Sequence, residues 1–412
     1  MSLSQHHAAE GAFDGYASEA ERTPALGAHG RERNRSTALA NFAKIVVFAT
    51  FLLMSLGGFV TSYQAGMAVP DWPLSFGSLN PEGWWKDLHV SLEHGHRLLA
   101  MFVGLLTGVL CAWIWNNWRA LAVAVLVSAI LPYLARIGGA PRELVMHLAI
   151  WPAAVAFAAM LLWDRRRDLN PRPALTRWLA FAAFVAVCIQ ATFGGLRVTR
   201  ETAGAFDHAM VLRITHGTFA QIFFCILVAI AVVLSIRWTD PVLRAARGGK
   251  FLRNLAWIAV GAILLQLVAG ATMRHLGAGL AITTFPQAAA DGSLFPAEHN
   301  AYVDVNFAHT RVGAMLVTVL LLGVGVSALR RAGDEPRLTR PAWTLMALVL
   351  IQFSLGVFVI WHQKPRTLTT LHVVNGAALL GTTLLLAMRA TRAASLAETS
   401  QSTANRATLH TS

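Results

Sequence analysis

Ten long apolar runs are the feature of this sequence that most restricts its fold. A membrane-spanning helix needs about 20 predominantly apolar residues, and each run is close to that length. The chain is 55% hydrophobic and only 13% charged, whereas soluble domains are about 25% charged. The sequence therefore predicts an all-α integral membrane protein with about ten transmembrane helices. The runs lie at residues 43–66, 94–115, 119–137, 144–163, 177–197, 211–236, 253–274, 304–329, 341–361 and 368–389.

The charges of the connecting segments predict how the helices are oriented. Connections on the side of the two termini hold more lysine and arginine than those on the opposite side. Positive residues collect in cytoplasmic loops, so we expect both termini in the cytoplasm of a bacterial cell and a multi-pass protein of its cytoplasmic (inner) membrane. The same bias explains the net charge of +13, and no nucleic-acid partner is expected because no binding motif accompanies it. The polar ends, residues 1–42 and 391–412, are expected to be disordered cytoplasmic tails.

The sequence contains an internal repeat. The segment GGFVTSYQAGMAVPDWP, which begins at Gly57, matches GATMRHLGAGLAITTFP, which begins at Gly270, in two glycines, an alanine and a proline. The matched residues are 213 positions apart, and so are His96 and His309. Within the first segment, Asp71 is expected to form a turn or cap the loop.

A second match shows that the two repeats differ in length. Gln190 and Gln352 are only 162 positions apart, so the first repeat contains extra residues between its second and third helices. The sequence predicts two pseudo-symmetric four-helix transmembrane bundles plus an inserted two-helix hairpin. The expected divisions are 43–116 with 167–237 for the first bundle, 117–166 for the hairpin and 251–390 for the second bundle.

Four histidines lie near the outer ends of four spans, at similar depth. They are His96, His216, His309 and His372. An ionisable residue inside a bilayer is costly and is a functional candidate by default. One such histidine is as well explained by a hydrogen bond between helices, but four that are paired by a repeat favour ligands.

Two imidazoles on facing helices suit haem better than zinc. Zinc sites usually add cysteine or carboxylate ligands at short spacing, whereas two helices can clamp a haem through two axial imidazoles. We expect His96 to pair with His216, and His309 with His372. The histidines of the first outer loop and helix, His89 and His94, are expected at the membrane interface.

The two histidine sites are chemically unequal. Glu93 lies three residues before His96, on the same helical face, whereas the corresponding residue of the second repeat is Asn306. A carboxylate beside one site favours chemistry in the first bundle and electron storage in the second. The alternative for Glu93 is an acid in the first helical turn that the helix dipole favours.

Arginines follow the first ligand of each bundle. Arg97 and Arg311 are candidates for pairing with haem propionates, as is Arg197. The alternative is that these side chains extend to the interface.

At these residues the sequence resembles the haem A synthase family of membrane proteins. The resemblance covers the eight core helices in the family's order. It departs from the family pattern at Thr310, which separates His309 from Arg311 where the family more often has arginine directly after histidine. The segments that carry it are GGFVTSYQAGMAVPDWPLSFG (57–77), EHGHRLLA (93–100), QATFGGLRVT (190–199), ITHGTFAQIFF (214–224), NFAHTRVGA (306–314) and TLHVVNGA (370–377).

The resemblance implies an oxidoreductase that converts haem O to haem A. The C8 methyl group of haem O would be oxidised to a formyl group by successive hydroxylations, which supplies haem A to cytochrome oxidase. The family's essential glutamate maps onto Glu93, and its four axial ligands map onto His96, His216, His309 and His372. From the asymmetry at Glu93 we expect substrate haem O in the first bundle and a haem b cofactor in the second.

The resemblance also implies partners. Haem O synthase is the implied donor of the substrate, and the electron acceptor stays open, with a quinone as one candidate. A second class of function is a dihaem b-type electron-transfer protein, such as a quinol-linked cytochrome b. The histidines alone allow it, but it does not need the difference between Glu93 and Asn306.

Overall fold

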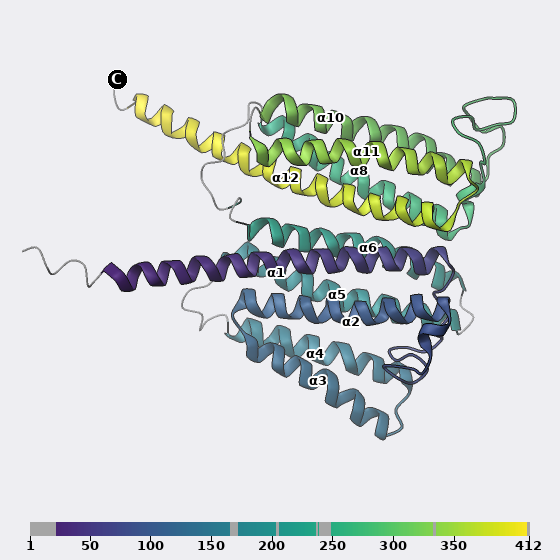
Figure 1. Ribbon diagram of the computed structural model, residues 1–412, viewed down its shortest axis with the longest axis horizontal. Coiled ribbons are helices and arrows are strands. Elements are labelled where there is room, and N and C mark those ends of the chain that lie inside the picture. Colours follow the sequence, from purple (N-terminus) through teal and green to yellow (C-terminus); the bar gives the residue numbers. More distant parts are fainter. Residues whose placement is uncertain are drawn as a thin grey trace, which may run out of the picture.

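The computed structural model describes residues 22–164, 172–202, 206–235, 238, 249–332 and 335–409. In these ranges the chain is helical apart from its loops, and no strand forms. Ten helices in the same ranges are long and apolar enough to cross a membrane, as the apolar runs predicted. They lie side by side with their axes roughly aligned (Figure 1).

Nine of the spans are single helices, and the eighth is interrupted. That span consists of α9 (Ala301–Phe307), a π-helical turn (Ala308–Gly313) and α10 (Ala314–Ala332). The other spanning helices are α1 (Arg22–Ser62), α2 (Leu88–Trp115), α3 (Trp118–Ile137), α4 (Arg142–Asp164), α5 (Ala174–Thr202), α6 (Phe206–Val233), α8 (Gly249–His275), α11 (Pro336–Trp361) and α12 (Arg366–Leu409).

The helices pack in two groups of four. In the first group α1, α2, α5 and α6 contact one another, and in the second group α8, α10, α11 and α12 do so. The groups meet through α1, α6, α8 and α12, while α3 and α4 pack together against α2 and α5 (Figure 1). The pseudo-symmetric relation between the groups, and the domain boundaries given above, remain predictions.

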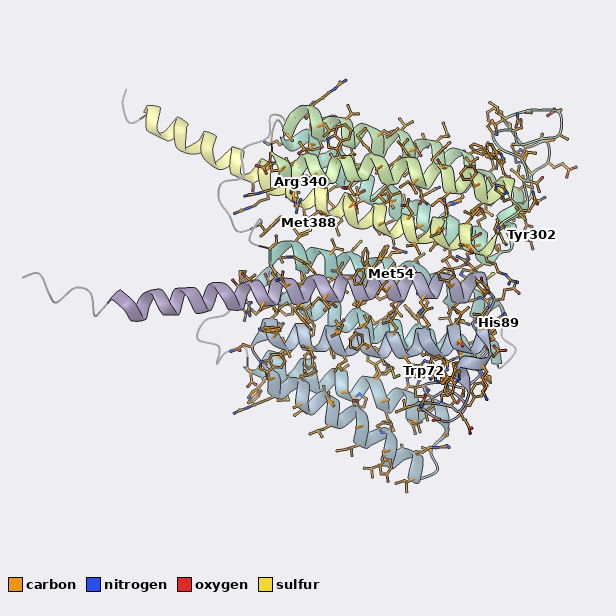
Figure 2. The ribbon with its side chains drawn as sticks, in the orientation of Figure 1. Met54, Trp72, His89, Tyr302, Arg340 and Met388 are labelled. Carbon is orange, nitrogen blue, oxygen red and sulfur yellow. The ribbon has the colours of Figure 1, made fainter. Side chains whose placement is uncertain are left out.

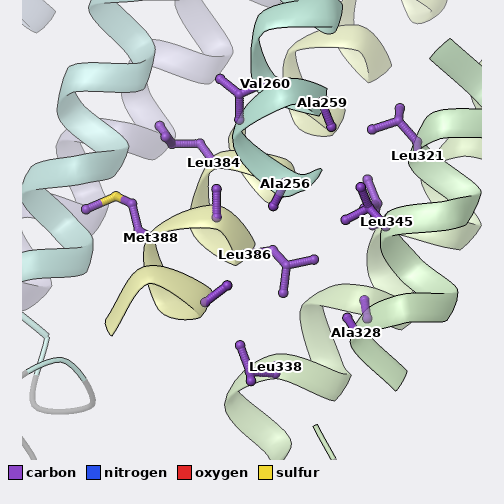
Figure 3. Packing of buried hydrophobic residues seen from close by; sticks show 14 of the residues in the cluster. Ala256, Ala259, Val260, Leu321, Ala328, Leu338, Leu345, Leu384, Leu386 and Met388 are labelled. Atoms are coloured by element: carbon purple, nitrogen blue, oxygen red, sulfur yellow. The ribbon is translucent and has the colours of Figure 1, made fainter. Parts of the chain in front are cut away.

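Each group has its apolar core in the half that lies toward the chain termini. Figure 3 shows part of the core of the second group, where Ala256, Leu321, Leu345 and Leu386 meet from four helices. The first group has a similar cluster that includes Leu110. The opposite half of each group is therefore left to the histidines and to the cavity described below.

The two ends of the helix array differ in their residues. Figure 2 shows Trp72, His89 and Tyr302 at the end that carries the two long outer loops, and Arg340 at the end nearer the termini. In the first outer loop the carboxylate of Asp71 accepts hydrogen bonds from the backbone N–H groups of Phe76 (2.8 Å) and Gly77 (2.7 Å). The predicted loop-capping role of Asp71 is thus confirmed.

The structure differs from the prediction at both tails. α1 already begins at Arg22 and α12 continues to Leu409, although residues 22–42 and 391–409 were expected to be disordered. The only proline in these two segments is Pro24, and it lies in the first turn of α1, where proline is tolerated. No proline therefore interrupts either helical extension. The C-terminal stretch is also rich in alanine, the strongest helix former, so both spans extend beyond their apolar parts. Residues 1–21 lie outside the described ranges.

The hairpin of α3 and α4 is anchored at the end near the termini. Phe157 of α4 is fully buried, and its ring lies 4.3 Å from that of Phe184 on α5. The amide of Asn117 also donates to a carboxylate oxygen of Asp164 (3.0 Å), which joins the ends of the two hairpin helices. Toward its other end α3 diverges from α2 (Figure 1).

We expect Phe157→Ala to weaken the attachment of the hairpin. Truncation of a fully packed phenylalanine typically costs about 3–5 kcal/mol, and the midpoint of thermal unfolding in detergent should fall accordingly. Trp163→Ala is the matched control, because that side chain is on the same helix and 73% exposed. Equal shifts for the two variants would show that Phe157 does not anchor the hairpin.

Candidate functional site

All four predicted ligand histidines line one large cavity. Its volume is about 1200 Å³, and its walls come from both helix groups and from the hairpin. This is larger than pockets that hold one small molecule, which are about 300–1,000 Å³. The structure therefore brings together His96, His216, His309 and His372, which are far apart in the sequence.

Each of these four rings packs against a glycine of the preceding spanning helix. A methyl group at Gly57, Gly270 or Gly356 would stand closer to the ring carbon Cε1 than an ordinary van der Waals contact, whereas a methyl at Gly194 would just touch it. The distances from such a methyl carbon to Cε1 are 3.0 Å for Gly57 and His96, 3.4 Å for Gly194 and His216, 2.6 Å for Gly270 and His309, and 3.2 Å for Gly356 and His372.

Nδ1 of these rings faces the glycine-bearing helix. In His96, His216 and His309 this atom is inaccessible and forms no hydrogen bond of ordinary geometry, and a methyl carbon at the facing glycine would lie 3.2–3.9 Å from it. Nε2 of these rings is therefore the nitrogen that a ligand in the cavity could reach.

The second pair has a spacing that fits a shared metal. The ring centres of His309 and His372 are 6.4 Å apart, and their planes are at 82°. Metal–imidazole bonds of about 2 Å on either side of one metal place two ring centres roughly 6 Å apart. These two side chains therefore fit the axial positions of a haem iron.

Three of the four glycine helices carry a glutamine one helical turn before the glycine. The Gln190 and Gln266 amides donate to the backbone carbonyls of His216 and His309, both at 2.8 Å. The Gln352 amide lies 3.2–3.3 Å from the ring nitrogens of His372. In the sequence, Gln190 and Gln352 stand out only as matched positions of the two repeats. The four-residue spacing between each glutamine and its glycine was the sequence signal that could have revealed the contacts of these glutamines with the histidines.

In α1 the corresponding residue is Leu53, four positions before Gly57. His96 is thus the one ligand candidate without a glutamine of this kind, and it is the one that has Glu93 on its own helix. The first repeat thus lacks the glutamine at the same histidine that has the Glu93 carboxylate beside it.

Glu93 is a buried carboxylate with one free oxygen. It is 3% exposed, and Oε1 accepts a hydrogen bond from Nε of Arg97 at 3.0 Å. Its second oxygen, Oε2, is buried without a partner, and the residue lines the cavity. Asn306 instead donates to the backbone carbonyl of Ala278 at 2.8 Å and does not line the cavity. The two repeats therefore differ at this position: the carboxylate of Glu93 faces the cavity, whereas the amide of Asn306 does not.

Arg97 and Arg311 hold the two outer loops. Arg97 donates to the backbone carbonyls of Val69 (2.8 Å), Asp71 and Leu74 (3.1 Å). Its partner in the repeat, Arg311, donates in the same way to the carbonyls of the second loop. These carbonyls belong to Thr284 and Gln287.

Only one of these two arginines faces the cavity. Arg97 lines it and Arg311 does not, and a contact of either residue with a haem propionate remains a prediction.

The π-helical turn explains the departure at Thr310. A π-turn accommodates one extra residue in a helix. Beyond it RLLAM (97–101) matches RVGAM (311–315) at a separation of 214, whereas His96 and His309 are 213 apart. Thr310 is therefore an insertion that the turn absorbs, and His309 and Arg311 both keep the positions of their counterparts.

The outer end of the first group carries further charges. Arg213 donates to both carboxylate oxygens of Glu201 at 3.0 Å. Arg197 lies 3.9 Å from Glu201 and donates to the backbone carbonyl of Gly66. All three charged residues line the cavity. At matching repeat positions the second group has the uncharged Val359, Gln363 and Thr369.

His94 occupies a different environment from the one predicted. It is 2% exposed rather than interfacial. Its Nδ1 lies 2.8 Å from the hydroxyl of Ser75, and its ring packs 4.8 Å from that of Trp84. The outer loop folds back over the start of α2 and covers this histidine, which no local sequence pattern indicated. His89 is half exposed, as expected at an interface.

The fold and the site together define a class of protein. In the described part of the chain no three histidine, cysteine or carboxylate side chains cluster to hold a metal ion by themselves. Instead, buried imidazoles line an apolar cavity among long apolar helices. This is a multi-pass membrane protein whose site is suited to haem held by paired histidines.

The chain belongs to the COX15-CtaA family, described as cytochrome oxidase assembly protein. The model of that family matches residues 143–384, which is more than half of the chain. Curated relatives agree with this assignment. A protein of Bradyrhizobium sp. (strain ORS 278) named "Heme A synthase" is 25% identical over 362 residues, which are 84% of this chain and 88% of that protein.

Two further relatives of the same name come from distant bacteria. The protein of Symbiobacterium thermophilum is 29% identical over 329 residues, which cover 78% of this chain and 84% of its own length. The protein of Geobacillus kaustophilus is 23% identical over 356 residues, which cover 85% and 92%. The similarity thus extends over most of the chain.

We expect Gly270→Ala to displace the His309 ring, because the new methyl would stand 2.6 Å from Cε1. Changes to residues that orient a metal ligand typically cost 10–100-fold in affinity, so the affinity of the His309–His372 pair for haem should fall by at least tenfold, whereas the His96–His216 pair should be unaffected. Gly261→Ala is the control, since a methyl there meets nothing within 4 Å. Equal haem contents, read from absorbance spectra, would contradict the packing role of Gly270.

Proposed function

We propose that this chain is a haem A synthase, which oxidises the C8 methyl group of haem O to a formyl group. The observation that carries this proposal is the free, buried oxygen of Glu93 in the cavity that holds the four imidazoles. Family membership and the names of the relatives support it. A dihaem electron carrier gains no support from these findings, because it has no use for a carboxylate beside one pair only.

We assign the substrate and the cofactor to different groups. His96 and His216 would hold substrate haem O, since Glu93 lies beside this pair. His309 and His372 would hold haem b, and the 6.4 Å between their ring centres would leave room for one iron between them. Bound haem b would supply one-electron redox capacity at this position.

The side chains of the first group would position a proton acceptor next to the substrate. Arg97 binds one oxygen of Glu93 and three carbonyls of the loop, so the carboxylate is held in one orientation. Oε2 stays free to accept a proton that is released as the methyl carbon is oxidised. Burial excludes bulk water from this oxygen, so protons would leave through fixed groups.

The reaction requires the porphyrin substrate to stay bound through two oxidation steps. Conversion of a methyl to a formyl group removes four electrons from the carbon: two hydroxylations give a geminal diol, which then loses water. Two rounds on one bound substrate require that the porphyrin stay in place between them. The cationic side chains of Arg197 and Arg213 at the outer end of this group are suited to pair with its propionates.

The cellular setting is part of the proposal. We place the protein in the bacterial cytoplasmic membrane with both termini inside, on the basis of the arginine-rich connections near the termini. Haem O synthase would deliver the substrate, and a quinone is the proposed class of electron acceptor. A substrate this apolar would be transferred within the membrane rather than through water.

Glu93→Gln should keep both porphyrins bound but stop formyl production. General acid–base groups contribute about 10²–10⁴-fold to a rate, so haem A should fall at least a hundredfold. The measurement is mass analysis of haems extracted from cells that express haem O synthase and have no other source of haem A. Asp304→Asn, a change at an exposed carboxylate, should leave haem A unchanged. Wild-type haem A from Glu93→Gln would refute the catalytic role.

His309→Ala should remove the haem b and spare the bound haem O. The reason is that His309 and His372 form one pair, whereas His96 and His216 lie in the other helix group. The ratio of the two porphyrins in the purified variant, again by mass analysis, decides the assignment. Loss of haem O with retention of haem b would reverse the two sites.

A further inference from the structure

The cavity has an apolar arm that runs away from the first histidine pair. On α2 the residues Ala100, Gly104 and Gly108 follow His96 at four-residue intervals, and all four line the cavity. At a rise of 1.5 Å per residue these positions span about 18 Å of helix. A methyl at Gly104 would meet no atom within 4 Å, so this part of the wall borders open space.

The inserted hairpin forms the opposite wall of the arm. Leu121, Ala124 and Val125 of α3 line the cavity, and so do Ile150, Ala153 and Ala154 of α4. None of these side chains is charged or polar. The one hydroxyl among the hairpin residues of this wall, on Ser128, donates to the carbonyl of Val125 in its own helix at 2.9 Å. The arm therefore offers no partner to a polar ligand.

The cavity wall has different residues in the second helix group, where Ala314, Thr318 and Leu321 of α10 line it. RLLAMFVGLLTG (97–108) matches RVGAMLVTVLLL (311–322) after the Thr310 insertion, so Gly104 corresponds to Thr318 and Gly108 to Leu322. A larger side chain thus occupies the position that is open at Gly104, whereas a methyl at Gly108 would already meet Leu121 of the hairpin at 3.2 Å. No hairpin lies between α10 and α11, which are joined by a short connection.

We propose that this arm binds the isoprenoid tail of the porphyrin substrate. The proposal rests on the function proposed above and extends it to the inserted hairpin. Haem O differs from haem b by a farnesyl-derived side chain of three isoprene units. With carbon–carbon bonds of about 1.5 Å, such a chain extends on the order of 15 Å, which is close to the length of the arm.

The location of the arm agrees with this ligand. It opens from the cavity beside His96 and His216, and the hairpin that walls it packs only against the group that carries Glu93. A tailed porphyrin would gain apolar contacts there that a tail-less one lacks. The hairpin would therefore decide which porphyrin enters the first site.

The test compares a tailed and a tail-less porphyrin. Haem O and protohaem are titrated by absorbance into the purified full-length protein with its haem b site filled. Gly104→Leu should weaken haem O binding at least tenfold and leave protohaem binding unchanged. Gly261→Leu is the matched control, because this exposed helical glycine also has open space around it and does not line the cavity.

A second variant narrows the arm from the other wall. Ala154→Phe should reproduce the selective loss of haem O if the hairpin holds the tail. Unchanged haem O affinity in both variants would overturn the proposal. Equal losses of haem O and protohaem affinity would overturn it as well. If the variants instead lose a co-purified phospholipid and still bind haem O, the arm holds a membrane lipid and the proposal is also wrong.

The outcome separates this inference from the proposed function. A wild-type protein that binds haem O more tightly than protohaem but never forms haem A would refute the enzymatic function and leave the arm in place. A wild-type protein that forms haem A while both variants bind haem O normally would refute the arm alone.

Discussion

The structure depends on the close contact between an imidazole and a glycine, which occurs four times. Each contact lets a polar ring enter an apolar helix interface, where an ionisable group is costly. The glycines keep the backbone of the preceding helix close enough to hold the ring in one place. The packed cores lie in the other half of each helix group, so the histidine half can stay open as a cavity.

The two repeats differ in the residues beside their histidines. Glu93 faces the cavity, whereas Asn306 is used within the protein, and Leu53 replaces a glutamine that the other three sites retain. Arg197, Glu201 and Arg213 add charge to the same half. Under the proposed function, these differences would make the first of two similar histidine sites the reactive one. The hairpin adds an apolar wall to the cavity beside that half.

The sequence predicted the spans and the key histidines because both depend on local pattern. Apolar runs of about 20 residues determine the helices, and the repeat identifies His96 and His309 as equivalent. The loop contacts of Arg97 and Arg311 were not predicted, since they join residues distant in the chain. In the sequence, the π-turn at Thr310 is visible only as one extra residue between His309 and Arg311. The helical extensions beyond both apolar ends were missed because polar residues with good helix propensity resemble disordered tails in composition.

The central claim is that the first group oxidises a porphyrin that the second group does not. The most direct test is mass analysis of all porphyrins extracted from the wild-type protein after co-expression with haem O synthase in cells without haem A. The account predicts haem A, or its hydroxymethyl precursor, together with haem b. Two molecules of haem b per chain, with no oxidised derivative of haem O, would contradict it and point to an electron carrier.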